Sequence, residues 1–220
     1  MFLQIEDFLT AAEAQAISEL ARQTQFVEGR RSNPHNVTKN NVIVEPNDPN
    51  GQKAAQIALA AFQRSEAARN FVFPQRVAVP QLARYGTGMS YGAHVDSAFF
   101  PGGQMPMRSD VSCTIFINDP ATYQGGDLVI YVGSEDVRVK GKAGQAVFYP
   151  STTVHTVTPV TSGERLVMIT FIESQIADQL QREVLYTLNE VRALEGLKMD
   201  WRSRTQLEFV SQNLHRMWAK

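Results

Sequence analysis

The tripeptide His94-Val95-Asp96 combines the residue types and the spacing that are best suited to bind a metal ion. On a β-strand, residues i and i+2 point to the same face of the sheet, so the imidazole of His94 and the carboxylate of Asp96 would lie side by side. An HxD tripeptide also arises often by chance, and alone it indicates only two polar residues on an ordinary strand. A third ligand is needed before the pair predicts a metal site.

The candidate for this third ligand is His155, which lies about sixty residues downstream in an otherwise apolar segment that we expect to be a strand. Two histidines and one carboxylate leave three positions of an octahedral iron ion open, enough for a bidentate ketoacid and for dioxygen. Alone, His155 would be interpreted as a core histidine bonded to a backbone carbonyl. Together with His94 and Asp96, it predicts a mononuclear iron site.

Arg165, ten residues after His155, is a candidate for binding the far carboxylate of a ketoacid. We expect the two strands to form a hairpin around the turn 161–163. A three-residue loop with Gly163 left-handed puts His155 opposite Ile169 and Arg165 on the same face as His155, whereas a two-residue loop turns Arg165 to the other face. In the first register, Arg165 lies roughly 13 Å along the hairpin from His155. This distance suits a guanidinium group that reaches back to the far carboxylate of a ketoacid whose other end binds the iron. Otherwise a lone arginine here is a solvated surface charge.

The helices that should flank this site lie at both ends of the chain, residues 1–74 and 175–220. Thr10 and Glu13 form a capping box that predicts a helix over 11–23. Residues 29–51 are rich in Asn, Pro and Gly and predict a long loop with a short strand at 42–44, followed by a helix over 52–69. Near the C-terminus we expect a helix whose apolar stripe is Ile176, Leu180, Val184, Leu188 and Val191, and another helix over 203–218.

Residues 75–174, between these helical parts, should form the β core. Apolar and β-branched residues come in short runs broken by Gly, Pro, Asn and Asp, which is typical of an all-β sandwich or barrel. We therefore expect a mainly β fold with flanking helices, built as one compact unit. The eight runs are 75–85, 92–96, 111–118, 127–132, 136–141, 145–151, 154–160 and 165–173.

The composition of the 220 residues excludes several classes of protein. The hydrophobic share of 43% and the charged share of 20% are those of an ordinary soluble globular protein. A net charge of −1 provides no basic surface for nucleic acid or an anionic membrane, so we expect neither partner. The single Cys113 cannot form an internal disulfide and suits a reducing compartment. Without a secretory signal or a long apolar run, we expect a cytoplasmic location.

With these residues in this order, the sequence resembles the PKHD-type (prolyl/lysyl hydroxylase domain) bacterial hydroxylases of the Fe(II)- and 2-oxoglutarate-dependent dioxygenase superfamily. The likeness runs through most of the chain, including its C-terminal helical part. It is carried by VEGRRSNPHNVTKNN (27–41), RYGTGMSYGAHVDSA (84–98), RSDVSCTIFINDPATYQGGDLVI (108–130) and VKGKAGQAVFYPSTTVHTVTPVTSGER (139–165).

The resemblance implies a double-stranded β-helix (jelly-roll) core and a hydroxylase that uses Fe(II), 2-oxoglutarate and O2, with L-ascorbate as a common reductant. Carried over by position, His94, Asp96 and His155 are the iron ligands and Arg165 binds the co-substrate. Tyr85, nine residues before His94, matches a tyrosine that helps to hold the co-substrate carboxylate in related prolyl hydroxylases. An ordinary core or rim tyrosine is an equally open interpretation. No catalytic residue beyond the metal centre is expected.

Other functions and the substrate stay open on the sequence alone. A non-catalytic, cupin-like barrel that binds a metal or a ligand is one alternative, and a metal-dependent isomerase or hydrolase is another; neither gives Arg165 a role. The substrate is either a peptidyl proline or lysine or a small molecule. The sequence does not decide between them, because the loop 29–51 offers no residue that indicates a ligand. The amphipathic C-terminal helices are available to pack against a second copy, as in a homodimer. His35 and His215 are expected to be structural or solvent-facing.

Overall fold

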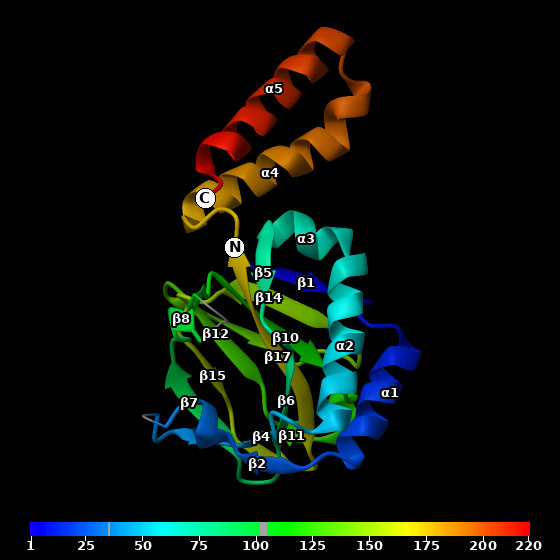
Figure 1. Ribbon diagram of the computed structural model, residues 1–220, viewed down its shortest axis with the longest axis vertical. Coiled ribbons are helices and arrows are strands. Elements are labelled where there is room, and N and C mark those ends of the chain that lie inside the picture. Colours follow the sequence, from blue (N-terminus) through cyan, green and yellow to red (C-terminus); the bar gives the residue numbers. More distant parts are fainter. Residues whose placement is uncertain (35, 102–104) are drawn as a thin grey trace.

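The structure is a computed structural model that describes residues 1–34, 36–101 and 105–220. Its centre consists of short β-strands in antiparallel sheets (Figure 1). The strands are β1 Leu3–Ile5, β2 Phe26–Glu28, β3 Lys39–Asn40, β4 Val42–Val44, β5 Pro74–Val77, β6 Gln81–Tyr85, β7 Ser90–His94, β8 Phe99–Phe100, β9 Met107–Arg108, β10 Val111–Phe116, β11 Gln124–Gly125, β12 Leu128–Val132, β13 Glu135–Val139, β14 Ala146–Pro150, β15 His155–Val157, β16 Val160–Ser162 and β17 Arg165–Ser174. His35 lies outside the described residues.

Two of these sheets pack face to face. The eight-stranded sheet has the order β1-β14-β10-β17-β6-β4-β2, with β5 also beside β17, and the five-stranded sheet has the order β13-β12-β15-β7-β3. Apolar side chains from both sheets form one buried cluster between them, for example Ala83 and Val167 from the larger sheet and Leu128 and Ile130 from the smaller. The expected fold class, a double-stranded β core flanked by helices from both ends of the chain, is confirmed.

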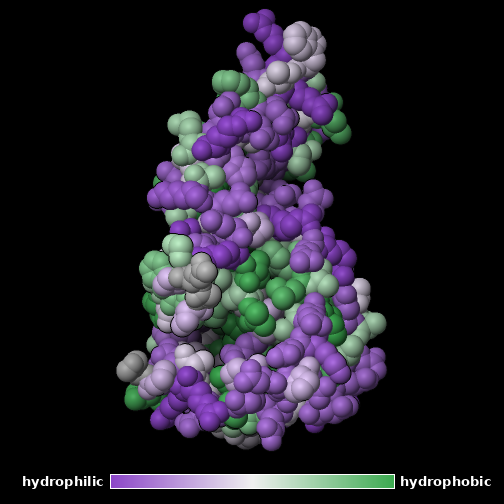
Figure 2. Space-filling model, viewed as in Figure 1, coloured by the Kyte–Doolittle hydropathy of each residue, from purple (hydrophilic) through white to green (hydrophobic). Residues whose placement is uncertain are grey.

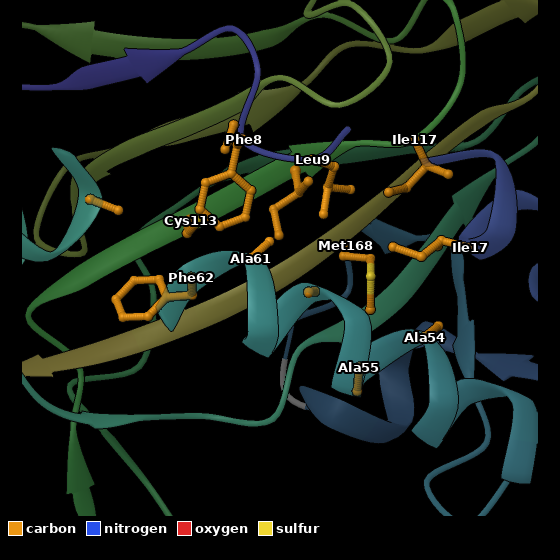
Figure 3. Close-up of a cluster of buried hydrophobic side chains, with 14 of the residues drawn as sticks. Phe8, Leu9, Ile17, Ala54, Ala55, Ala61, Phe62, Cys113, Ile117 and Met168 are labelled. Atoms are coloured by element: carbon orange, nitrogen blue, oxygen red, sulfur yellow. The ribbon is translucent and has the colours of Figure 1, made fainter. Parts of the chain in front are cut away.

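Three N-terminal helices, α1 Ala11–Arg22, α2 Pro49–Arg64 and α3 Glu66–Val72, cover the other face of the eight-stranded sheet. Figure 3 shows this outer cluster, in which Phe8, Ile17 and Phe62 pack with Cys113 and Met168 of the sheet. Because alternate residues of a strand point to opposite faces, the same strands supply both buried clusters. The position of each side chain along a strand therefore decides whether it faces the helices or the space between the sheets.

The first helix is as predicted, but the second is not one helix. Thr10 caps α1 by accepting from the Glu13 backbone N–H, and the Glu13 side chain accepts from the Thr10 N–H, which is the expected capping box. The helix expected over 52–69 begins earlier and is interrupted. Asp48 caps it with Pro49 at the first turn, and Ser65 ends α2 and caps α3 by accepting from the Ala68 N–H.

Each of the eight expected runs overlaps a strand, two of the runs are divided, and further short strands lie outside the runs. The run 75–85 is split into β5 and β6 by residues 78–80, and the run 154–160 into β15 and β16 by residues 158–159. Proline occurs in both gaps, Pro80 and Pro159, and it has no N–H to donate to a ladder. The strand β4 at Val42–Val44 is also as predicted.

The C-terminal helices, α4 Gln179–Glu195 and α5 Trp201–Trp218, form a hairpin that projects from the sheets (Figure 1). Its base is anchored by Ile176 and Leu185, which pack with Phe73. Most of the predicted apolar stripe is solvent-exposed, with 69% of Leu180 accessible. In Figure 2 the projecting helices are mainly hydrophilic with scattered apolar side chains, whereas apolar side chains gather in a hollowed area of the sheet region. No helix among the described residues has the length and apolar character needed to cross a membrane.

Candidate metal centre and co-substrate site

The three predicted metal ligands lie together at one end of the five-stranded sheet. His94 ends β7 and His155 begins β15, and the two residues are directly opposite each other in the ladder between these strands. Asp96 follows β7 by two residues, so the expectation that it lies on the strand is wrong in detail. Its carboxylate oxygens are 3.8 Å from His94 Nε2 and 3.7 Å from His155 Nε2. Donor atoms of all three residues lie within 4.8 Å of one another.

Backbone carbonyl groups fix the orientation of both imidazole rings. The Nδ1 atom of His94 is 2.8 Å from the Gly92 carbonyl oxygen, and that of His155 is 3.0 Å from the Thr153 carbonyl oxygen. A carbonyl only accepts, so each Nδ1 carries the hydrogen and each Nε2 has a free lone pair. Both lone pairs belong to the atoms nearest Asp96. This is the tautomer and orientation that a histidine metal ligand requires.

A chain of serine hydroxyl groups holds the Asp96 carboxylate. Ser112 Oγ donates to Asp96 Oδ2 at 2.6 Å, and Ser151 Oγ lies 2.8 Å from Ser112 Oγ and accepts from Ser109 Oγ at 2.8 Å. All three serines are buried. Groups that hydrogen-bond to a ligating carboxylate fix its direction and commonly contribute to metal affinity.

Burial keeps His94 neutral at physiological pH. Burial, followed by the nearby imidazole of His155, lowers the pKa of His94 to about 4. The Tyr91 ring stacks on His94 with 3.6 Å between ring centroids, and the Tyr149 ring meets the edge of His155 at 5.0 Å. A neutral imidazole is the form that binds a metal, so the His94 ring is ready for a cation at neutral pH.

Arg165 reaches the space between the sheets by a different route from the one expected. Among the described residues β15 pairs with β12 and β7, whereas β17 pairs with β10, β6 and β5, so the predicted hairpin between the His155 and Arg165 strands is wrong. Gly163 is left-handed with φ +74°, as predicted, but the turn connects β16, which pairs with β11 in a two-stranded sheet, to β17 of the eight-stranded sheet. Arg165 nevertheless points inward and is 1% exposed.

Tyr85 is the direct neighbour of Arg165, opposite it in the ladder between β6 and β17. The guanidinium carbon lies 5.0 Å from the centre of the Tyr85 ring and 5.6 Å from that of Phe116. Gly126 has φ +67°, and a Cβ there would come within 3.1 Å of Arg165 Cδ, so the absence of a side chain at this turn leaves space for the arginine. Gly126 thus has a packing role beside Arg165.

Polar atoms of Arg165, Tyr85 and the nearby Tyr123 have no hydrogen-bond partner within the described protein. Arg165 Nε and Nη1, the Tyr85 hydroxyl and the Tyr123 hydroxyl are buried without a hydrogen bond. Burial raises the pKa of Tyr85, while the charge of Arg165 acts in the opposite direction. A buried cation and a neutral phenol that are both unpaired would be costly unless a ligand satisfies them. An anionic group fits this position, and a ketoacid with a second carboxylate is such a ligand.

A cavity of about 660 Å³ joins these parts and is lined by the three candidate metal ligands and Tyr85. One wall is apolar and includes Val79, Ile169 and Phe171. Another part of the lining comes from the predicted loop and carries polar side chains that the sequence did not single out. These are Ser32, Asn33, Lys39 and Asn41.

Lys39 is the positive charge on this polar wall. Its Nζ donates to Ser32 Oγ at 2.5 Å and lies 5.2 Å from the centre of the Tyr91 ring. Burial lowers the pKa of Lys39, and the negative charge of Asp96 opposes this shift. Its position follows from pairing of β3 with β7, which sets Lys39 opposite Tyr91. A lysine in a stretch rich in Asn and Pro gives no local signal of such pairing.

His215 and the neighbouring residues Phe99 and Phe100 are not part of the metal centre. His215 packs against Phe73 with 5.3 Å between ring centroids, and its Nε2 is 2.9 Å from Gln175 Oε1, so its role is structural as expected. Phe100 lines the cavity and stacks on Phe171, whereas Phe99 is 61% exposed.

Comparison with known proteins gives consistent results. Residues 80–173 match the model of the 2OG-Fe(II) oxygenase superfamily. A PKHD-type hydroxylase from Sphingopyxis alaskensis is 45% identical over 205 residues, covering 93% of this chain and 94% of the relative, and one from Rippkaea orientalis is 37% identical over 228 residues, covering 100% of both.

Among solved structures, a Pseudomonas putida prolyl-4-hydroxylase is 21% identical with a TM-score of 0.59, over 79% of this chain and 92% of that one. A Trichoplax adhaerens prolyl hydroxylase in complex with a hypoxia inducible factor peptide is 18% identical with a TM-score of 0.60, over 83% and 86%. At this identity the two structures support the fold alone.

Proposed function

Because the chain belongs to the PKHD-type hydroxylases of the 2OG-Fe(II) oxygenase superfamily, we propose that His94, Asp96 and His155 hold its iron ion and that Arg165 and Tyr85 bind 2-oxoglutarate. The chain is a 2-oxoglutarate- and iron-dependent hydroxylase, as its family implies. The observation that carries the residue assignment is the joint placement of two kinds of unsatisfied group. Three convergent metal donors and Tyr85 line the same cavity, and the unpaired buried guanidinium of Arg165 lies beside the Tyr85 ring.

The chemistry of the donor set supports iron. Two neutral imidazole nitrogens and one carboxylate are the ligands of the facial triad of non-haem Fe(II) oxygenases, which leaves adjacent positions open. When bound, iron, 2-oxoglutarate and dioxygen together supply the oxidising power that converts a substrate C–H bond to C–OH, with succinate and carbon dioxide as the other products.

The protein's own residues orient the reactants and limit access of water. The carbonyl groups at Gly92 and Thr153 hold the two imidazole rings, and Ser112 holds the Asp96 carboxylate. Arg165 offers two unpaired N–H groups to the far carboxylate of the co-substrate, and Tyr85 adds a hydroxyl donor. The apolar wall around Ile169 and Phe171 keeps part of the cavity dry.

We infer that the substrate is either a peptidyl proline or lysine or a small molecule. The two structural neighbours are prolyl hydroxylases, one of them bound to a peptide. A cavity of about 660 Å³ accommodates a single side chain or a compact molecule. We further propose L-ascorbate as the reductant that maintains the iron as Fe(II), which follows from the family resemblance.

We also propose that a homodimer uses the exposed apolar face of α4. Leu180, Val184 and Val191 lie on this face and are 69%, 44% and 43% exposed, and Met1 is beside them. A second copy would remove these side chains from water. Light scattering at several concentrations, compared with the variant Leu180→Glu, tests this proposal; a wild-type monomer at high concentration would contradict it.

The alternatives of a non-catalytic barrel and of an isomerase or hydrolase explain less of the site. Both explain a metal bound by His94, Asp96 and His155. Neither explains why Tyr85, which lines the cavity, and its neighbour Arg165 are buried with unpaired polar atoms. An isomerase or hydrolase would also work without oxygen, so oxygen dependence separates these activities from a hydroxylase.

The assignment is tested by anaerobic reconstitution with Fe(II) and 2-oxoglutarate. We expect a weak metal-to-ligand charge-transfer band in the visible spectrum, and succinate release when air is admitted. The variant His155→Ala should fold but lose the band, because it lacks one of the three ligands. The control His215→Ala should keep the band, since His215 packs on Phe73. An unchanged band in His155→Ala would refute the ligand assignment.

A further inference from the structure

Asn41 is a buried polar side chain for which the reaction so far has no role. It is 3% exposed and lies on the cavity wall. Neither its Nδ2 nor its Oδ1 atom has a hydrogen-bond partner within the described protein. An unpaired buried amide costs free energy, and a purely structural asparagine is normally hydrogen-bonded on at least one side. Two unpaired amide atoms on a cavity wall therefore indicate a ligand.

The sheet register places Asn41 in a row with the two proposed co-substrate residues. Val42 faces Arg84 and Ile43 faces Ala83 in the antiparallel ladder between β4 and β6, so the next position sets Asn41 beside Tyr85. Tyr85 in turn faces Arg165 in the ladder between β6 and β17. Directly opposed residues lie on the same face of a sheet and within reach of one another.

Two further observations place Asn41 on the inner face beside the phenol. Asn41 and Ile43 are two residues apart and share a face, and Ile43 belongs to the buried cluster between the sheets. Burial raises the pKa of Tyr85, and the charge of Arg165, followed by the nearby side chain of Asn41, acts to lower it. The Asn41 amide is thus a near neighbour of the Tyr85 hydroxyl group.

Close packing against Gly29 holds the amide of Asn41 in place. A Cβ at Gly29 would lie 1.8 Å from Asn41 Oδ1, and the Gly29 N–H donates to the Asn41 carbonyl oxygen at 2.8 Å. The side chain is therefore positioned by packing against the backbone at Gly29, while its own amide makes no hydrogen bond. A polar group that is fixed but unpaired is preorganised for binding.

We propose that Asn41 is a third co-substrate-binding residue, which donates from Nδ2 to the far carboxylate of 2-oxoglutarate alongside Arg165 and Tyr85. This inference rests on the proposed co-substrate site. An ionised carboxylate has about four acceptor positions. Arg165 Nε and Nη1 supply two donors, the Tyr85 hydroxyl a third and the Asn41 amide a fourth. A carboxylate buried this deeply needs such a complete set to offset its loss of water.

The test compares the binding of two ketoacids that differ only at the far end. Isothermal titration calorimetry on the Mn(II)-loaded protein measures Kd for 2-oxoglutarate and for 2-oxopentanoate, which ends in a methyl group. We expect Asn41→Ala to weaken 2-oxoglutarate binding on the order of 10-fold, the contribution of one charge-assisted hydrogen bond. Asn41→Asp, which adds a negative charge at the same place, should weaken it about 100-fold or more. Neither change should alter the weak binding of 2-oxopentanoate.

Thermal unfolding of the Mn(II)-loaded variants, with and without 2-oxoglutarate, separates this role from a structural one. Because the amide makes no hydrogen bond, Asn41→Ala should leave the Tm of the ligand-free protein nearly unchanged while reducing the rise in Tm on adding 2-oxoglutarate. Gly29→Ala should reproduce the selective loss, since its Cβ displaces the amide. Equal weakening of both ketoacids, or of neither, would overturn the proposal for Asn41.

Arg165→Met serves as the reference variant in these titrations. If Arg165→Met loses the preference for 2-oxoglutarate and Asn41→Asp keeps it, the role of Asn41 is refuted and the proposed co-substrate site stands. If the wild-type protein itself shows no preference for 2-oxoglutarate over 2-oxopentanoate, the proposed co-substrate site fails, and the inference fails with it.

Discussion

The two faces of the eight-stranded sheet come from the same strands, but they differ in how completely their polar groups are paired. The outer face packs side chains such as Cys113 and Met168 against the N-terminal helices in an apolar cluster (Figure 3). The inner face carries Arg165, Tyr85 and Asn41, all buried and all with polar atoms that lack a partner among the described residues. Every side chain with a buried unpaired polar atom in the described part belongs to this row or, like Tyr123, lies beside it.

This difference indicates that stability and ligand binding are assigned to opposite faces. A dense apolar face contributes to folding by removing surface from water. A face with unpaired polar groups reduces the stability of the folded protein in the absence of a ligand, and the protein becomes more stable when the ligand binds. Substitutions on the outer face should therefore reduce mainly the stability of the protein. Substitutions on the inner face should reduce mainly its affinity for the ligand.

The largest effect on stability should come from Phe148→Ala on the outer face. Phe148 is fully buried, and its ring contacts Phe8 and Phe62 with centroids 5.7 Å and 6.3 Å away. Removing a buried ring leaves a cavity and typically costs about 3–5 kcal/mol. Urea denaturation of the metal-free protein should show this loss in the free energy of unfolding, whereas the folded variant should keep the wild-type Kd for 2-oxoglutarate. A large loss of affinity in the folded protein would contradict the separation of the faces.

On the inner face, Arg165→Met should have the opposite pattern. Methionine fills a similar volume and removes an unpaired buried guanidinium, so the metal-free protein should be as stable as the wild type or more stable by up to about 2 kcal/mol. The loss of the contacts with the Tyr85 and Phe116 rings offsets part of this gain. The Kd for 2-oxoglutarate should rise about 100-fold. Denaturation and calorimetry on the same sample measure both, and a clear loss of stability would show that the guanidinium supports the fold.

How far the sequence predicts this molecule depends on the range of the interactions. The capping box at Thr10, the left-handed Gly163 and the eight strand runs follow from local rules, and the structure has them. The convergence of His94 and His155 was predicted from residue types, although the ladder that joins their strands connects distant segments. Local spacing led to the wrong hairpin for Arg165, because pairing with β6 and β10 is decided by the whole sheet.

Asn41 illustrates what a local interpretation misses. In the sequence it is one of several asparagines in a polar stretch that predicts a loop. Its burial and its place beside Tyr85 arise only when β4 pairs with β6. The same holds for Lys39, whose place on the cavity wall depends on pairing of β3 with β7. Segments that are polar and irregular in sequence can thus supply one whole wall of a site.

The smallest effect should come from an ion pair on the helical layer outside the sheet, and it depends on pH. Arg64 on α2 donates two hydrogen bonds to Glu13 on α1, at 2.9 Å and 2.8 Å, and this pairing is the main cause that lowers the pKa of Glu13 to about 2. An acid whose pKa is lower in the folded than in the unfolded state stabilises the fold above its unfolded pKa, near 4.5. That contribution is lost as pH falls from about 4.5 towards 2.

Comparing the wild type with Glu13→Gln isolates this contribution, because glutamine at this position keeps the capping box with Thr10. At pH 7 the variant should be less stable by at most about 1 kcal/mol, since solvent screens a pair in which half of the Arg64 side chain is exposed. The difference in unfolding free energy should shrink as the pH approaches 2, and the affinity for 2-oxoglutarate at neutral pH should not change. A difference that stays constant across this range would mean that the residue acts through packing or capping and not through its charge.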